Sequence, residues 1–235
     1  QNGRPVASIP GGVFLTLPAE NPSPGTAAVA AFADGSRRVV GKAAFSRGLC
    51  IVPLDKPAAV TLEDRGLVFL DTSRHWAKDA IAFVTSRELF FGTAEESFSP
   101  DAGMSRAMLV AVLHRLEGAP DAGRPAFSDV AGADYYAGAV AWALAGGVAD
   151  GMGGGRFAPH EPISREQLAV MLYRLAGAGG KAGTDESAGA DGLSLFSDGD
   201  TVSAWAKDAV AWAVRAGLMG GKTGGRLDPS GHATR

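Results

Sequence analysis

Large apolar side chains recur at helical spacing in the part of the chain that follows residue 75. Three alanine-rich segments, which open at Trp76, Tyr135 and Trp205, carry such residues three or four positions apart. This spacing predicts one helix in each segment. Two further apolar stripes have the same spacing: Leu109, Val112, Leu113 and Leu116, and Leu168, Met171, Leu172 and Leu175. The pattern therefore predicts pairs of helices, each pair joined by a glycine-containing loop.

Residues typical of helix ends mark the limits of these segments. Ser164 and Gln167 form a capping-box pattern, which predicts that a second helix starts at Ser164. Gly147 and Gly217 follow two of the first helices, where glycine commonly ends a helix in the left-handed conformation. Because Glu88 stands at the matching position of the first segment, that helix is expected to end differently.

These helix pairs belong to a threefold internal repeat. Each copy has an opening Phe-x-Asp, a glycine, an apolar residue, a proline and a hydroxyl-Arg pair. The members are Phe69, Phe127 and Phe196; Asp71, Asp129 and Asp198; Gly92, Gly151 and Gly221; Phe98, Phe157 and Leu227; Pro100, Pro159 and Pro229; Ser105-Arg106, Ser164-Arg165 and Thr234-Arg235. One such unit cannot bury its apolar face alone, so the copies should pack on one another. The third copy stops at the start of its second helix, which suggests a fragment with a frayed or partner-covered third copy.

The first 66 residues have a different pattern. Short β-type runs at Val13–Leu17, 27–33, 37–40, 49–53 and 58–62 are separated by Pro, Gly and Asp. Asp34-Gly35 between two of them predicts a hairpin turn. We expect an α+β chain: a small sandwich-like all-β module at 1–66, which could lack upstream strands, followed by all-α helix-loop-helix repeats at 67–118, 125–177 and 194–235. Residues 178–193 are rich in Gly, Ala, Asp and Ser, which predicts a flexible linker.

Composition excludes several classes of function. The net charge is -3 and the sequence pI is about 5.8, so there is no basic surface for nucleic acid. No apolar run reaches the roughly 20 residues needed to cross a bilayer, so no membrane insertion is expected. The single cysteine, Cys50, cannot form an internal disulfide and lies in an apolar run, where a buried, unreactive thiol is expected. The chain starts at Gln1 without a signal peptide, so an export signal would have been upstream or removed.

Residues that could support catalysis or metal binding do not form a convincing set. The four histidines occupy different places relative to the repeat: His75, His114, His160 and His232. The glycine-rich segment 151–155 lacks the Lys-Ser/Thr of a phosphate loop and is better explained as a turn. The repeated Asp71, Asp129 and Asp198 are expected to bind loop amides. We therefore expect no active site and no cofactor in this segment.

The repeated arginines suggest an anion site instead. Arg106 and Arg165 stand in the first turn of their helices, where a cation is disfavoured by about 0.3–1 kcal/mol. Unpaired N–H groups at a helix start favour an anion, and a guanidinium beside them can bind a carboxylate through two hydrogen bonds. The alternative is that these arginines pair with an acidic residue of a neighbouring copy, and that the repeated aromatics are core residues.

The repeated motif resembles the S-layer homology (SLH) domain over roughly residues 67–235. The Ile-Thr-Arg-Ala-Glu motif of that family corresponds to Met104-Ser105-Arg106-Ala107-Met108, then Ile163-Ser164-Arg165-Glu166-Gln167, then Ala233-Thr234-Arg235. The first copy lacks the acidic residue of the motif. The resemblance implies a pseudo-threefold bundle of three tandem repeats. It also implies non-covalent anchoring of an exported protein to cell-wall polysaccharide, often through pyruvylated sugars.

A site and a location follow from this resemblance. The implied glycan-binding residues are Arg106, Arg165 and Arg235, with Trp76, Tyr135 and Trp205 able to stack on sugar rings. The expected partner is an anionic wall polysaccharide, outside the cell, at the wall of a Gram-positive-type bacterium. Two alternatives stay open. The chain could be the C-terminal ancillary segment of a secreted glycan hydrolase or protease, or a structural module that contacts proteins of a surface layer or its own upstream domains.

Overall fold

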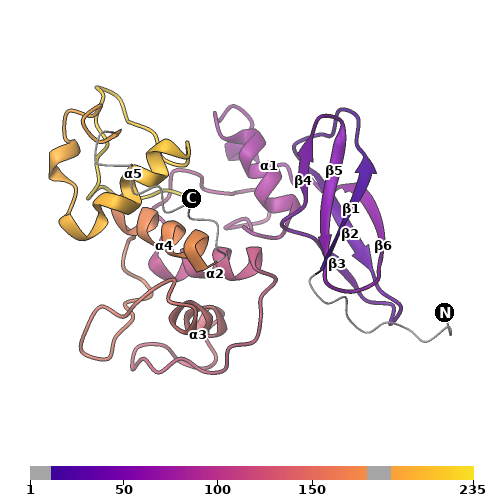
Figure 1. The fold of residues 1–235 in the computed structure, drawn as a ribbon, viewed down its shortest axis with the longest axis horizontal. Coiled ribbons are helices and arrows are strands. Elements are labelled where there is room, and N and C mark those ends of the chain that lie inside the picture. Colours follow the sequence, from indigo (N-terminus) through magenta and orange to yellow (C-terminus); the bar gives the residue numbers. More distant parts are fainter. Residues whose placement is uncertain (1–11, 179–191) are drawn as a thin grey trace. The chain divides into compact units, whose positions relative to one another are not determined.

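The computed structural model describes residues 12–178 and 192–235, and contains both helices and antiparallel sheets (Figure 1). This confirms the α+β class. Two compact units are present: residues up to Pro100 together with Arg115–Ala119, and Asp101–His114 together with Pro120–Arg235. The boundary between the units falls after Pro100, within the first repeat. Most of the predicted linker, residues 179–191, lies outside the described residues.

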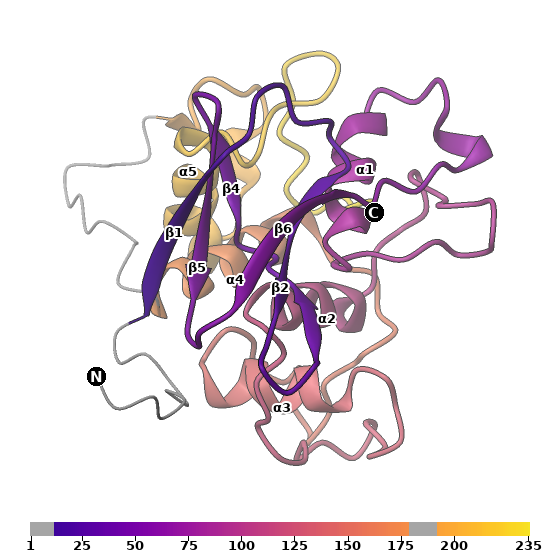
Figure 2. The same cartoon turned by 90° about the vertical axis from the view of Figure 1, so that its right-hand side faces the viewer.

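The β module consists of six strands in two sheets. The strands are β1 Val13–Pro18, β2 Thr26–Ala31, β3 Arg37–Val39, β4 Ala44–Ser46, β5 Leu49–Leu54 and β6 Ala59–Asp64. The sheet orders are β1-β5-β4 and β3-β2-β6, and all neighbouring strands are antiparallel (Figure 2). The five predicted strands are present, and β4, whose only large apolar residue is Phe45, was not predicted. The predicted hairpin joins β2 to β3, with Gly35 at φ 84°.

The core of the module lies between the two sheets. Its buried residues come from both, among them Ala28 and Ala30 of β2 and Cys50, Val52 and Leu54 of β5. Alternate residues of β5 point inward, as expected for a strand with one buried face. Cys50 is completely buried, so the predicted burial of this cysteine is confirmed, and burial raises the pKa of its thiol.

Five α-helices are described in the repeats. They are α1 Lys78–Ser86, α2 Arg106–Leu116, α3 Ala137–Ala145, α4 Arg165–Ala178 and α5 Lys207–Arg215, with short 3-10 helices η1 Leu70–Thr72, η3 Gly199–Thr201 and η4 Ala204–Ala206. The predicted capping box at the start of α4 is confirmed, because Ser164 and Gln167 exchange backbone-to-side-chain hydrogen bonds of 3.1 and 3.2 Å. The repeated aromatics of the predicted site lie two residues before α1, α3 and α5; they are Trp76, Tyr135 and Trp205.

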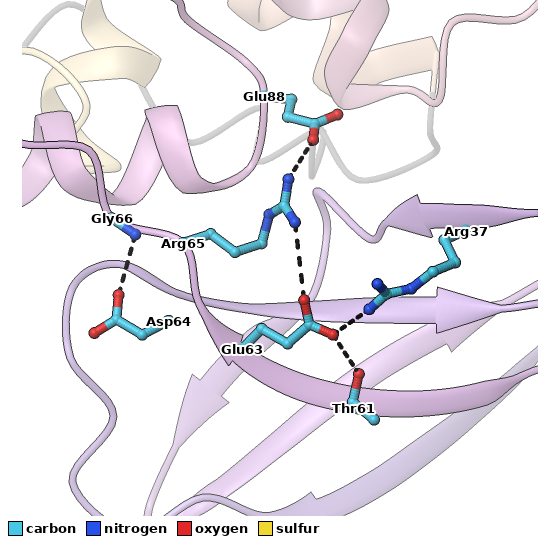
Figure 3. Close-up of polar contacts among 7 residues, drawn as sticks. All are labelled: Arg37, Thr61, Glu63, Asp64, Arg65, Gly66 and Glu88. Atoms are coloured by element: carbon cyan, nitrogen blue, oxygen red, sulfur yellow. Dashed lines mark hydrogen bonds and ion pairs between the residues drawn. The ribbon is translucent and has the colours of Figure 1, made fainter.

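The first helices of all three copies end in the same way. Gly147 and Gly217 follow α3 and α5 with φ of 65° and 69°, as predicted. The expectation that α1 ends differently was wrong, because Glu88 adopts the same left-handed conformation with φ 57°. Its carboxylate accepts a 2.7 Å hydrogen bond from Arg65, which also faces Glu63 of β6 (Figure 3). This contact joins the end of the β module to the end of α1 within one compact unit.

The repeated glycine is required by a ring that packs against it. A Cβ built on Gly151 would lie 2.6 Å from the Phe127 ring, and one on Gly92 would lie 2.7 Å from Phe69. The Phe127 ring lies against Phe157, with 5.5 Å between centroids. The predicted structural role of the repeated apolar position is also confirmed, since Phe98, Phe157 and Leu227 are fully buried. The Phe-x-Asp and Gly positions of the repeat are therefore linked by packing.

We expect Gly151→Ala to lower the free energy of unfolding by about 1–3 kcal/mol, because a methyl group there would overpack the Phe127 ring. Gly138→Ala is the matched control. Gly138 lies inside α3 with open space around its Cα, so the same change should stabilise the chain by about 0.5–1 kcal/mol. Urea unfolding measures whether the two variants change the free energy of unfolding in opposite directions. Equal unfolding midpoints for the two variants would show that the methyl group at position 151 does not overpack the ring.

Candidate functional site

The motif residues of the three copies meet in a closed ring of backbone hydrogen bonds. The N–H group of Met104 donates to the carbonyl oxygen of Ala233 at 2.9 Å, Ala233 donates to Ile163 at 3.0 Å, and Ile163 donates to Met104 at 2.9 Å. These residues hold the first position of the motif in each copy, and all three are buried. The ring joins the motif segments of the three repeats inside one compact unit.

The first N–H groups of α2 and α4 are also used between repeats. The N–H of Arg106 donates to the carbonyl of Glu161 at 3.0 Å, and the next N–H of α2 donates to Pro159 at 3.0 Å. In α4 the corresponding acceptors are the carbonyls of Gly231 and Pro229, each at 2.9 Å. The expectation of unpaired N–H groups at these helix starts was therefore wrong. The proline turn of the following copy satisfies them, so they are not open to an anion.

The side chain of Arg106 also reaches the second repeat. Its Nε donates to the carbonyl oxygen of Phe157 at 3.1 Å and its Nη2 to that of Asp150 at 2.8 Å. The guanidinium lies 4.8 Å from the centre of the Phe157 ring, and the residue is only 4% exposed. Burial lowers the pKa of Arg106, which is opposed by the charge of Asp150. Arg106 thus links the first and second repeats through the backbone.

Arg165 makes the same contact with the third repeat. Its Nε donates to the carbonyl oxygen of Leu227 at 2.8 Å and its Nη2 to that of Gly220 at 2.7 Å. Arg165 is only half-buried, so part of its guanidinium stays accessible. Arg235 follows the pattern in its backbone, since its N–H donates to Ala102 at 3.2 Å, and its side chain is half-buried. The acceptors in these bonds of Arg106 and Arg165 are backbone carbonyls, so the bonds do not support the alternative that these arginines pair with an acidic residue of a neighbouring copy.

The three aromatic residues of the predicted site lie on the surface. Trp76 is 89% exposed, Tyr135 is 67% exposed and Trp205 is 60% exposed. The alternative that these aromatics are core residues was therefore wrong. An aromatic ring that is exposed at the same position of all three copies is accessible to a sugar, on which such a ring can stack.

The repeated aspartates hold the loop of their own copy. Both oxygens of Asp71 accept hydrogen bonds from the N–H groups of Phe98 and Ser99, at 2.7–3.1 Å. Asp129 binds the corresponding N–H groups of its loop at 2.8 Å each, and Asp198 does so at 2.6 and 2.9 Å. The predicted role of these aspartates in binding loop amides is confirmed. No group of three or more His, Cys, Asp or Glu that could hold a metal was found within residues 12–178 and 192–235.

These hydrogen bonds make the stability of the repeats depend on pH. The backbone N–H of Phe98 lowers the pKa of Asp71, and that of Leu227 lowers the pKa of Asp198. In Asp129, burial raises the pKa but the loop N–H groups outweigh it, and the pKa is lowered. A carboxylate whose pKa is lower in the folded state stabilises the fold above its unfolded pKa of about 3.9, and loses this effect as the pH falls through the folded value.

We therefore expect stability to fall steeply below about pH 4. Substituting Asp198→Asn should flatten this dependence, because asparagine keeps an oxygen acceptor but cannot ionise. Denaturant unfolding between pH 2.5 and pH 6 measures the slope. If the variant and the parent chain show the same slope, Asp198 does not supply this part of the stability.

Two contacts made by side chains of the second repeat were not predicted. The hydroxyl of Tyr136 lies 3.3 Å from Nε2 of His160, and the carboxylate of Glu166 accepts hydrogen bonds from the N–H and hydroxyl of Ser203 at 3.1 and 3.0 Å. An alignment of the three copies contains a signal for the pair of Tyr136 and His160. The positions of Tyr136 and His160 hold other residue types in the other copies, and the departure occurs at both places in the same copy.

Comparison with known proteins identifies the family. The model for the S-layer homology domain matches residues 68–107, 126–169 and 195–235, which together form more than half of the chain. The chain therefore belongs to the S-layer homology domain family, as the motif residues predicted. The three matches coincide with the three tandem copies of the repeat. The family and the similarity to a surface-layer protein indicate that the chain is an extracellular cell-surface segment with a wall-binding module.

The relatives are larger proteins. The amylopullulanase of Thermoanaerobacterium thermosulfurigenes is 32% identical over 71% of this chain, and exoglucanase XynX of Acetivibrio thermocellus is 32% identical over 77%. The surface-layer 125 kDa protein of Lysinibacillus sphaericus is 28% identical over 68%. The chain spans 9%, 16% and 13% of these three proteins. The similarity thus concerns an anchoring module and only a small part of each enzyme. Within the described residues, the helices are too short or too polar to cross a membrane.

Proposed function

We propose that this chain anchors its parent protein non-covalently to an anionic cell-wall polysaccharide, such as one with pyruvylated sugars. The observation that carries the proposal is the exposure of Trp76, Tyr135 and Trp205 at one position of three family repeats. An exposed aromatic ring can stack on the apolar face of a sugar while its surroundings bind the hydroxyl groups. The chain itself is a binding module without catalytic activity in this proposal.

The arginines have two roles in this proposal. Arg106 is buried, so it acts by holding the loop of the next copy in place. Arg165 and Arg235 are half-buried, and the Nη1 group of Arg165 is the donor that its two carbonyl contacts leave for a glycan oxygen. A guanidinium fixed by its other nitrogens is already oriented, which lowers the entropy lost when it binds a ligand.

The cyclic hydrogen bonds support a pseudo-threefold arrangement of the repeats. Met104, Ile163 and Ala233 are equivalent positions, and each donates to one of the others and accepts from the remaining one. We propose that the three copies are related by an axis through this ring. Several sites that bind one wall polymer would raise the overall affinity, because the first contact raises the effective concentration of the others.

Sedimentation with purified cell walls tests the proposal. The chain should pellet with intact walls and stay in solution with walls from which the polysaccharide has been extracted. Retention by both wall preparations would point to peptidoglycan or protein instead of polysaccharide. If the chain pellets with neither preparation, it does not bind cell walls and the proposal is wrong.

A second candidate is favoured by the relatives. Two of them are named as enzymes, and this chain spans 16% or less of each. We propose that the chain serves as the ancillary segment of a larger secreted protein, which fits the anchoring function. A module that contacts proteins of a surface layer is the remaining alternative, since one relative is a surface-layer protein. A purified chain that associates with itself but not with walls would favour that alternative.

A further inference from the structure

The second repeat has a tyrosine-histidine pair that the other copies lack. The hydroxyl of Tyr136 and Nε2 of His160 are 3.3 Å apart. The residues at these two positions in the first and third copies are Ala77 and Asp101, and Ala206 and Ser230. Neither of those combinations can form the same contact. The second repeat therefore has a side-chain arrangement of its own, next to the exposed aromatic at Tyr135.

Tyr136 is a buried spacer between two exposed rings. It is 4% exposed, whereas Tyr135 and His160 are on the surface. Its ring meets Tyr135 edge to face at 5.0 Å and 82°, and meets the imidazole of His160 at 5.8 Å and 83°. Packing of this kind restricts both exposed rings to defined orientations. Since Nε2 of His160 is engaged by the phenol, Nδ1 is the nitrogen left to bind a ligand.

An exposed cation stands in the same segment. Arg156 precedes the buried Phe157, four residues before His160, and its side chain is 64% exposed. Its Nε lies 3.5 Å from Asp129, the residue whose carboxylate holds the N–H groups of this segment. Asp129 thus holds the backbone between Arg156 and His160 through two hydrogen bonds. The other nitrogens of the exposed guanidinium are open to an anion, because only Nε faces the carboxylate.

The corresponding loop of the first repeat has the opposite charge. Ser97 takes the place of Arg156, and Glu95 and Glu96 come directly before it. The third repeat keeps the cation as Arg226, 3.5 Å from Asp198, but lacks the tyrosine-histidine pair. A negatively charged ligand would be repelled by the first loop and attracted by the other two. The three copies therefore offer different environments to an anionic sugar.

We infer that the second repeat is the main reading site for an acidic saccharide, a sugar that carries a carboxylate. Tyr135 stacks on the sugar ring, Nδ1 of His160 hydrogen-bonds a hydroxyl group, and Arg156 pairs with the carboxylate. Tyr136 is a positioning residue that orients the two exposed rings. The third repeat binds the same ligand more weakly, and the first binds it least. This inference rests on the proposed function, because it assigns the same ligand class to one of the three repeats.

Titration of the full chain with purified pyruvylated wall polysaccharide tests the inference. We expect His160→Ala and Tyr136→Phe each to weaken binding about 5- to 10-fold, and the double substitution to weaken it no further than the stronger single one, since the residues act as a unit. Arg156→Ala should weaken binding more than Arg226→Ala does. Ser230→Ala is the matched control at the histidine position of the third repeat, and should bind like the parent chain.

The outcomes separate the inference from the proposed function. Tyr136→Phe keeps the buried ring, so its unfolding midpoint should stay close to that of the parent chain while its affinity falls. Unchanged affinity in both His160→Ala and Tyr136→Phe, with a parent chain that binds, would overturn the inference and leave the wall-anchoring function in place. A parent chain that binds neither the intact polymer nor the depyruvylated one would overturn both.

Discussion

Replacing Arg106 with alanine is expected to lower the free energy of unfolding by about 2–4 kcal/mol. One hydrogen bond to a charged group contributes about 1.5–3 kcal/mol, and Arg106 makes two, to the carbonyls of Phe157 and Asp150. The desolvation of the buried guanidinium, seen in its lowered pKa, offsets part of that sum. The loss should also loosen the second-repeat loop, because both acceptors belong to it.

Two further variants make this expectation specific. Arg106→Lys should recover little stability, because an ammonium group cannot reproduce the planar fork that reaches both carbonyls. Arg226→Ala removes an arginine whose side chain is 63% exposed, and should change stability by no more than about 0.5 kcal/mol. Chemical unfolding of the three variants provides the comparison. An unfolding midpoint for Arg106→Ala equal to that of the parent chain would show that the inter-repeat contact contributes nothing.

Simultaneous replacement of Trp76, Tyr135 and Trp205 with alanine should reduce wall retention at least a hundredfold without unfolding the chain. An aromatic residue at the centre of a binding surface commonly contributes about 2 kcal/mol, which is more than tenfold in affinity. All three side chains are exposed, so little packing is lost when they are removed. The effects combine because simultaneous binding by several repeats raises the apparent affinity.

An exposed aromatic outside the repeats is the control for this variant. Phe14 of β1 is 76% exposed and belongs to the β module, so Phe14→Ala should leave wall retention unchanged. Bound fractions in wall pellets, measured over a range of chain concentrations, give the retention of each variant. If the triple variant is retained as well as the parent chain, then the repeated aromatics are not the contact surface.

The parts of the structure that the sequence predicted are those with a local or repeated pattern. The capping box of Ser164 and Gln167 is a contact between residues three apart, so it can be recognised in one segment. The burial of Phe98, Phe157 and Leu227 follows from the recurrence of an apolar residue at one register. The loop role of Asp71, Asp129 and Asp198 follows from the known preference of aspartate for backbone amides.

The partners of the arginines could not be predicted in the same way. Arg106 and Arg165 bind carbonyl oxygens of the next copy, and every residue in the chain carries such an acceptor. A sequence marks an acidic partner by its residue type, but a backbone partner has no such mark. The same holds for the N–H groups at the start of α2, whose acceptors lie more than 50 residues away in the second repeat. Only the folded arrangement of the copies reveals these bonds.

Local propensity was misleading at Glu88, and it did not decide between surface and core for the three aromatic residues. Glutamate disfavours the left-handed conformation, but Glu88 adopts it at the end of α1, where its carboxylate binds Arg65. Trp76, Tyr135 and Trp205 precede their helices by two residues, so the helical spacing of buried side chains does not extend to them. Their exposure is the feature on which the proposed binding function depends.

Sedimentation of this chain on purified cell walls, before and after chemical removal of the pyruvyl groups, tests carboxylate-dependent anchoring most directly. We expect strong retention on untreated walls and loss of most of it after treatment, because the carboxylate is the group that the arginines bind. Equal retention on treated and untreated walls would overturn this expectation, and would show that the wall contact does not depend on that charge.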